Sequence, residues 1–339
     1  MTCRLSKTRD VSLDNIRFFL ILTVVLGHLL RICQPFTGRW LLYQLIYTFH
    51  MPAFIFLFGY NAKFSPKRIL TRWCFPYIVF QVIYIAFANA VLKDDIAFQF
   101  TTPYWLLWYL LAGIYFQLLL PLFDTADPRR QLMILLCTFL IALGIGFVDS
   151  IGYFLSLSRL FVFLPWFLMG YYCKKNDLLT ILSAHKKTQV SVLLISAAII
   201  ALSLPYLHYG NIPRDLLFGG TSYAVCGGTV WMRGATMILS LSWILFLFVG
   251  IKPYLNRKFF LVTRIGQNTL PVFLLHGFIT RSTPLYFPYF LDSPLGVLLL
   301  TCAILVLFGN KIANKALYYL CFSWVERILP SPPITKESE

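Results

Sequence analysis

Long apolar stretches, each close to the twenty or so residues that an α-helix needs to cross a bilayer, follow one another through most of the 339-residue chain. Hydrophobic residues make up 59% of the sequence and charged residues only 12%, whereas soluble domains hold about 25% charged residues. This excludes an ordinary water-soluble protein. We therefore predict an all-α, polytopic membrane helix bundle of about ten transmembrane helices. The expected spans are 16–33, 46–62, 73–92, 104–122, 132–148, 151–173, 190–206, 230–249, 265–280 and 295–309.

Lys and Arg residues are distributed unevenly between the connections. Alternate connections hold 21 of the 29. By the positive-inside rule the richer side faces the cytoplasm, which places both termini there. The net charge of +16 is thereby explained without a nucleic-acid partner. We expect a cytoplasmic segment 1–15, a membrane domain 16–309 and a cytoplasmic tail 310–339, in a multi-pass protein of a cell membrane, the bacterial cytoplasmic membrane being the expected one.

The first span carries two side chains that are costly in a bilayer, Arg17 and His28. On insertion scales a charged side chain at the bilayer centre costs about 2.5–3.5 kcal/mol, so it needs a partner, a cavity or a function. Eleven residues at about 100° each return to within about 20° of the starting direction, with an axial separation of about 16 Å. Both side chains therefore project from one helix face, and we predict that they share a groove.

Two further histidines, His50 and His276, fall near the expected outer ends of their spans, at a depth similar to that of His28. Arg159 and Arg233 lie near the outer parts of two other spans. A lone membrane histidine is often only an interhelical hydrogen-bonding residue, so the prediction rests on the set. The common depth predicts one polar chamber in the outer third of the membrane.

Acidic residues are absent from the apolar cores of the expected spans. Asp14 stands at the inner edge of the first span, and the other acids lie in connections or at their margins. Proton-coupled transporters usually carry acidic relays within the bilayer, so the pattern argues against a pump. An imidazole exchanges a proton near neutral pH, which suits general-base chemistry on a hydroxyl instead.

The connections and the cysteines add two expectations. The longest outward connection, at about 207–229, is the candidate lid or acceptor-contact loop, and a plain solvated loop is the alternative. Eight scattered cysteines form no CxxC pair, so we expect neither a metal site nor disulfides.

Several motifs resemble those of the acyltransferase 3 family of integral membrane O-acyltransferases. The first helix of that family opens with a Leu-Asp-x-x-Arg pattern and contains Arg-x10-His. Three later segments are similar, in the same order, to motifs of the subgroup related to fucose 4-O-acetylase. The matching residues are Leu13, Asp14, Arg17 and His28, followed by FHMPAFIFLFGY (49–60), SRLFVFLPWFLMGYY (158–172) and NTLPVFLLHGF (268–278).

The resemblance implies an O-acetyltransferase that takes acetyl-CoA from the cytosol as its acyl donor and binds no cofactor permanently. The acceptor it implies is a hydroxyl of a cell-surface polysaccharide, glycolipid or lipid-linked sugar. Many relatives carry an additional extracytoplasmic hydrolase-like domain. This sequence shows none, so we expect the membrane domain to bring donor and acceptor together itself or to pass the acyl group to a partner.

Site roles follow from the resemblance and from the depth of the residues. The expected catalytic residues are His28, Arg17, His276 and His50, and the expected substrate-binding residues are Arg159, Arg233 and Asp14. Arg17 would also bind the phosphates of the donor. His28 would either deprotonate the acceptor hydroxyl or carry the acetyl group itself. A transporter or flippase of lipid-linked sugars is the alternative function, because it too needs a polar chamber and a basic rim.

Overall fold

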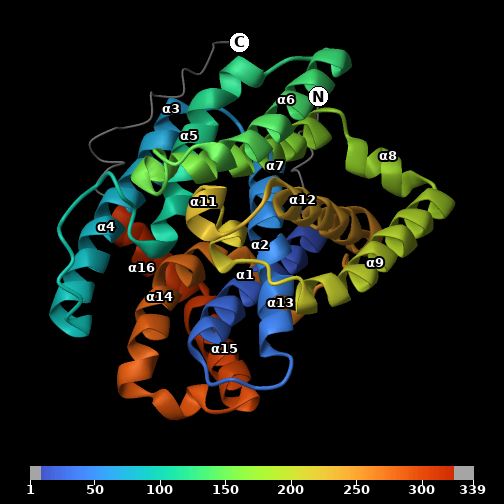
Figure 1. Ribbon diagram of the computed structural model, residues 1–339. Coiled ribbons are helices and arrows are strands. Elements are labelled where there is room, and N and C mark those ends of the chain that lie inside the picture. Colours follow the sequence, from blue (N-terminus) through green and yellow to red (C-terminus); the bar gives the residue numbers. More distant parts are fainter. Residues whose placement is uncertain (1–8, 324–339) are drawn as a thin grey trace.

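The computed structural model describes residues 9–323 and shows a bundle of helices (Figure 1). Within these residues there is no strand, as predicted for an all-α fold. A helix satisfies its own backbone hydrogen bonds, which lipid does not do, so apolar segments of this length fold as helices. The ends of the predicted cytoplasmic segments, with Arg4, Lys7, Arg327 and Lys336, lie outside the described residues.

The helices follow one another with short connections. In chain order they are α1 (Val11–Ile32), α2 (Arg39–Tyr60), α3 (Pro66–Ile69), α4 (Phe75–Phe87), α5 (Trp108–Phe123), α6 (Pro128–Gly144), α7 (Leu157–Lys175), α8 (Leu178–Ala184), α9 (Lys186–Tyr209), α10 (Arg214–Phe218), α11 (Tyr223–Cys226), α12 (Val230–Leu245), α13 (Phe260–Gln267), α14 (Thr269–Tyr286), α15 (Pro294–Phe308) and α16 (Lys311–Cys321). Short π and 3₁₀ segments extend several of them.

The predicted bundle of about ten spans is consistent with the structure, where length and hydropathy alone identify eight or nine candidates among the described residues. Among residues 9–323, eight helical segments are long and apolar enough to cross a membrane, or up to nine if the bent pair α15–α16 is one span. The difference arises in the last two predicted spans. Polar side chains such as His276 and Arg281 lower the hydropathy of α14, while α15 has only 15 residues and meets α16 at a 63° bend.

A capped turn fixes the start of α1. The Asp10 carboxylate accepts hydrogen bonds from the backbone N–H groups of Ser12 and Leu13, and it pairs with Lys252 at 3.0 Å. Burial alone raises the pKa of the Asp10 carboxyl, but the hydrogen bonds from Ser12 and Lys252 hold it below its ordinary value. The cap therefore ties the start of α1 to the connection that follows α12.

Two glycines let α2 and α7 approach until their backbones nearly touch. A Cβ added to Gly59 would collide with the carbonyl oxygen of Phe167, and one added to Gly170 would collide with the carbonyl oxygen of Phe56. Small residues serve this purpose in membrane bundles because close backbone approach replaces the missing hydrophobic driving force. The contact fixes how these two helices present their polar residues.

We expect Gly170→Ala to lower the thermal unfolding midpoint of the purified protein by about 2–4 °C, because overpacking costs about 1–3 kcal/mol. The matched control is Gly234→Ala on α12, where an added Cβ meets nothing within 4 Å. Melting curves followed by size-exclusion chromatography compare the two variants. Equal midpoints would show that α2 and α7 do not depend on this contact.

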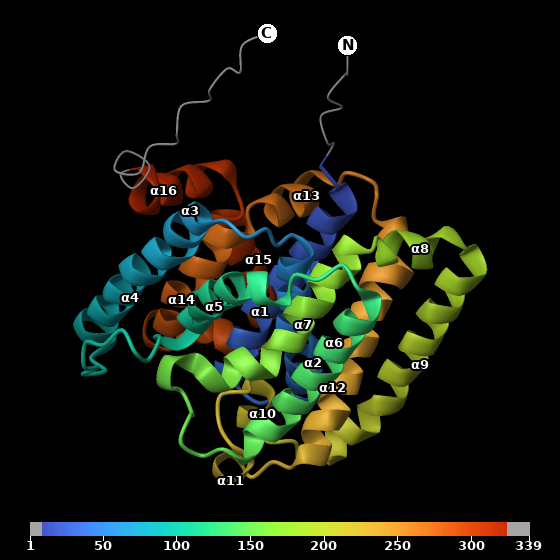
Figure 2. The ribbon, with the colours of Figure 1, turned by 90° about the horizontal axis from the view of Figure 1, so that it is seen from above.

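The bundle has two distinct ends (Figure 2). Helices α3, α13 and α16 lie at one end, together with the start of α1, and α10 and α11 lie at the other. We call the first the basic end, because Lys63, Lys174 and Lys252 lie there beside Arg17 and Asp10. The second is called the far end.

Candidate active site

Histidines from three helices meet in the half of the bundle nearer the far end. The ring centroids of His28 on α1 and His276 on α14 lie 5.3 Å apart. Tyr47 on α2 links His28 to His50: its ring centroid lies 4.8 Å from that of His50, and its hydroxyl lies 3.3 Å from Nδ1 of His28. The faces of the three helices thus turn toward one another, as the common depth of the histidines predicts.

Backbone carbonyls set the tautomers of two of these rings. Nδ1 of His50 lies 2.8 Å from the carbonyl oxygen of Ile46, and Nδ1 of His276 lies 2.9 Å from that of Val272. A carbonyl only accepts, so each Nδ1 carries the hydrogen and each Nε2 keeps its lone pair. Nε2 of His276 is buried and has no hydrogen-bond partner within residues 9–323.

Tyr47 can hold His28 in the same tautomer, with the hydrogen on Nδ1. When Nδ1 of His28 donates to the Tyr47 hydroxyl, Nε2 of His28 keeps a lone pair that can accept a proton. The sequence offers no carboxylate for this purpose, and nothing distinguishes Tyr47 there from the other 18 tyrosines of the chain. Its position relative to His28 depends on how α1 and α2 are rotated, which the sequence pattern does not give.

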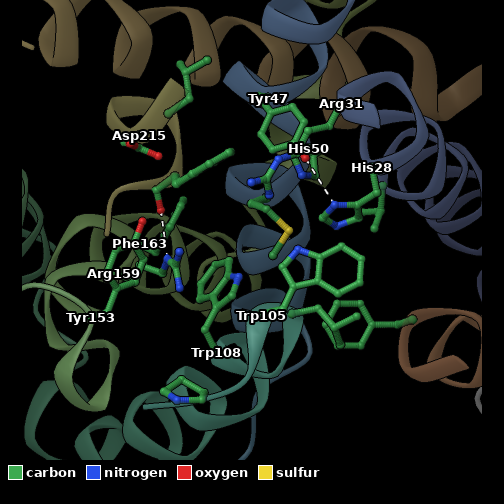
Figure 3. Close-up of a pocket in the computed structure, with 17 residues that line it drawn as sticks. His28, Arg31, Tyr47, His50, Trp105, Trp108, Tyr153, Arg159, Phe163 and Asp215 are labelled. Carbon is green, nitrogen blue, oxygen red and sulfur yellow. Dashed lines mark hydrogen bonds between the residues drawn. The ribbon is translucent and has the colours of Figure 1, made fainter. Parts of the chain in front are cut away.

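A cavity of about 240 Å³ lies against His28, His50 and Arg159. We call it the histidine cavity. Figure 3 shows His28 on one side and Arg159 on the other, with Trp105 and Trp108 between them. Two of the predicted catalytic histidines therefore share one space with a predicted substrate-binding arginine that comes from a different helix.

Arg159 is held in place by aromatic and backbone contacts. Its Nε donates to the carbonyl oxygen of Phe218 at 3.1 Å, and its guanidinium carbon lies 5.0 Å from the ring centroid of Trp108 and 4.9 Å from that of Tyr153. Cation–π contacts offset part of the cost of burying a guanidinium. The side chain thus keeps its charge at the wall of the histidine cavity.

The long connection at about 207–229 forms part of the same wall. Asp215, Leu217 and Phe218, all on α10, line the histidine cavity. Ser158 anchors this segment, because its hydroxyl donates to the carbonyl oxygen of Gly219 at 2.9 Å. The connection is therefore packed against the candidate site, and its predicted contact with an acceptor stays a prediction.

Four predicted site residues do not line the histidine cavity: Arg233 and His276, and also Arg17 and Asp14, which lie at the basic end. Arg233 is buried with its guanidinium 5.1 Å above the Tyr223 ring, and its three side-chain nitrogens have no hydrogen-bond partner among the described residues. His276 is fully buried. The geometry thus separates Arg233 from the histidine cluster and leaves His276 in contact with His28 rather than with the cavity.

Arg17 lies at the basic end, held by the buried carboxylate of Asp14. Asp14 accepts from Nη1 of Arg17 at 2.6 Å, from Nε of Arg9 at 2.7 Å and from Nε2 of Gln267 at 3.1 Å. Its side chain has no exposed surface. Asp14 therefore positions Arg17, and the structure offers it no free carboxylate face for the substrate binding that we predicted.

A large basic cavity lies in front of Arg17. Its volume is about 650 Å³, and its basic walls are Arg9, Arg17, Lys63 and Lys174. We call it the basic-end cavity. Lys63 follows α2, Lys174 lies in the last turn of α7 and Arg17 is on α1, so positive charges from three helices line one cavity. Such a concentration of charge favours an anionic ligand.

A third space links the two cavities. This connecting cavity, of about 210 Å³, shares Thr269 with the basic-end cavity and shares Met51 and Phe273 with the histidine cavity. The three cavities therefore lie one after another along α1, between Arg17 and His28, over an axial distance of about 16 Å. Arg17 and His28 line cavities at the two ends of this series, and the single groove predicted from their spacing stays a prediction.

Comparison with protein-family models decides what kind of membrane protein this is. A family model described as an acyltransferase domain matches residues 10–309. The chain belongs to the acyltransferase 3 family. This acyltransferase 3 protein is thus a multi-pass membrane acyltransferase, acting between an acyl donor and an acceptor in a lipid bilayer.

Membership of the acyltransferase 3 family does not favour the transporter alternative. Comparison with curated proteins and with solved structures gave no match. The relation of this acyltransferase 3 protein to the fucose 4-O-acetylase subgroup stays a prediction, as do the individual roles of its site residues.

Proposed function

We propose that the protein is an O-acetyltransferase that moves an acetyl group from acetyl-CoA to a hydroxyl of a cell-surface polysaccharide, glycolipid or lipid-linked sugar. The observation that supports this most is the line of cavities between Arg17 and His28. It offers a basic space at one end, a mostly apolar cavity with Arg72 in its wall in the middle, and an imidazole at the other end. These are the surroundings that a nucleotide, a pantetheine arm and a thioester need.

The basic-end cavity is the proposed donor entrance. Guanidinium groups form paired hydrogen bonds with phosphate oxygens, so Arg17 and Arg9 suit the phosphates of CoA. The uncharged arm would then pass Met51 and Phe273 and bring the thioester to His28. By the positive-inside rule we propose that this end faces the cytoplasm, in the bacterial cytoplasmic membrane.

His28 is the proposed general base. Its Nε2 takes the proton of the acceptor hydroxyl while that oxygen attacks the thioester carbonyl carbon. The new C–O bond forms first and turns the carbonyl oxygen into an oxyanion; when this intermediate collapses, the C–S bond breaks, and the CoA thiolate leaves and receives the proton back from His28. Arg159, across the histidine cavity, suits stabilisation of the oxyanion that develops between these steps.

Ester formation separates the transferase from a transporter. Purified full-length protein in lipid nanodiscs is incubated with ¹⁴C-acetyl-CoA and candidate glycans, and label that mild alkali releases from the glycan is counted. We expect alkali-labile acetyl esters on at least one acceptor class. Passage of the acceptor across vesicles without any ester would contradict the proposal.

Replacing Tyr47 by Phe tests the proposed orientation of His28. We expect kcat to fall about tenfold with little change in KM for acetyl-CoA, because groups that orient a functional histidine typically contribute about 10–100-fold. Tyr209→Phe is the control, since Tyr209 is exposed and lines none of the cavities described. Equal kcat values for the two variants would remove Tyr47 from the mechanism.

A further inference from the structure

A second cavity reaches His28 from a different direction. Its volume is about 320 Å³, and it shares His28, Arg31 and Trp105 with the histidine cavity. Its remaining walls include Tyr104 and Arg281. We call it the side cavity. Neither the connecting cavity nor the basic-end cavity shares a lining residue with it, so it lies off the proposed donor path.

The side cavity carries positive charge without an acid among its lining residues. Arg31 and Arg281 are its charged side chains beside His28. Arg281 forms an ion pair with Asp94, which follows α4 in the chain. Arg31 has no ion-pair partner within residues 9–323, and its described contact is with the Phe218 ring at 5.8 Å. One guanidinium is therefore available for an anionic ligand.

The position of Arg31 ties that anion to the reaction. Arg31 follows His28 by three residues on α1, so the two side chains are neighbours on one helix face, about 4.5 Å apart along the axis. This spacing is close to the width of one sugar ring. An anionic group held by Arg31 would thus place a hydroxyl of the same sugar unit at His28.

Trp105 forms the wall between the two cavities. Its ring centroid lies 4.7 Å from that of His28 at an interplanar angle of 69°, and its backbone φ is +43°. A positive φ is costly for a bulky side chain and persists only where the surrounding structure holds it. The indole therefore offers the side cavity a fixed, flat apolar face beside the base, as ligand pockets commonly do.

We propose that the acceptor is an acidic glycan unit, whose carboxylate or phosphate binds the unpaired Arg31 in the side cavity, with the Asp94-paired Arg281 as a second donor, beside the hydroxyl that His28 activates. This inference rests on the proposed function, because it names the acceptor class of the same reaction. The donor uses the basic charges at the opposite end of the line of cavities, so the two anionic groups do not compete for the same arginines.

Three small probes test the acceptor class with the full-length protein in detergent at low ionic strength: methyl β-D-glucuronide, glucose 1-phosphate and methyl β-D-glucoside. Binding is followed by tryptophan fluorescence, to which Trp105 contributes, and transfer by ¹⁴C-acetyl-CoA. We expect at least one anionic probe to bind about tenfold more tightly than the glucoside. Salt should weaken this preference, because exposed charges are screened.

Arginine variants assign the preference to the side cavity. Arg31→Gln and Arg281→Gln should each reduce the preference for the anionic probe over the glucoside at least about threefold, and the double variant should remove this preference. Arg214→Gln is the matched control, because Arg214 is exposed on α10 and lines neither cavity. Elution in size-exclusion chromatography verifies that each variant is folded.

Each outcome decides the inference. Preference for the glucuronide alone identifies a uronic acid, and preference for the phosphate alone identifies a phosphorylated sugar. Equal binding of all three probes, binding of none, or a preference that survives in the double variant would overturn the inference. Esters formed equally on neutral and acidic acceptors would overturn it while leaving the transferase intact. The double variant can lose the preference for anionic probes while the wild-type protein consumes no acetyl-CoA in a His28-dependent way. That pair of results would support the anion site and refute the proposed function.

Discussion

His28→Ala should lower acetyl transfer by at least about 10³-fold while the protein stays folded and inserted. A positioned general base contributes about 10²–10⁴-fold. We expect acetyl-CoA binding to be nearly unchanged, since the phosphates are held at the other end of the line of cavities.

His208→Ala is the matched control for that variant. His208 lies near the end of α9, packs edge-on against the Tyr209 ring and lines none of the cavities described. Initial rates with ¹⁴C-acetyl-CoA are compared at equal amounts of monodisperse protein. Near wild-type transfer by the His28→Ala protein would refute the assignment of His28.

The second large effect concerns the donor. Arg17→Gln should raise KM for acetyl-CoA by about 10–100-fold, because a hydrogen bond to a charged group contributes about 1.5–3 kcal/mol and about 1.4 kcal/mol is a factor of ten. We expect kcat to change less, since Arg17 lies far from the reacting atoms. The fold should survive, because Asp14 keeps its bonds to Arg9 and Gln267.

A truncated donor provides the control for Arg17. S-acetyl-pantetheine carries the thioester but lacks the nucleotide and its phosphates, so it should be used equally well by the wild-type and Arg17→Gln proteins. Steady-state kinetics with both donors separate binding of the phosphates from catalysis. An equal loss with both donors would mean that Arg17 does not recognise the phosphates.

Helical periodicity explains why part of the site could be predicted from the sequence. Arg17 and His28 lie on one helix, where eleven residues fix their common face, and the structure places both beside one line of cavities. The depths of His50 and His276 follow from counting residues along apolar spans. The all-α fold follows from the length of those spans, although within residues 9–323 the hydropathy of α14 and the length of α15 leave eight or nine candidates by length and hydropathy alone.

The contacts between helices could not be predicted in the same way. Membrane helices are apolar nearly all round, so the sequence does not reveal how each is rotated about its axis. Tyr47 beside His28 and Arg233 away from the histidine cavity both depend on those rotations. The pairing of Asp14 with Arg17 is different, since residues three apart on a helix are neighbours and their opposite charges signal an ion pair.

The most direct test is a structure of the full-length protein with a thioether analogue of acetyl-CoA, which is not cleaved by transfer. The account predicts density for the nucleotide in the basic-end cavity against Arg17, an extended arm passing Met51 and Phe273, and the acyl mimic within hydrogen-bond distance of Nε2 of His28. A nucleotide bound at the far end, or an acyl group outside the histidine cavity, would contradict it.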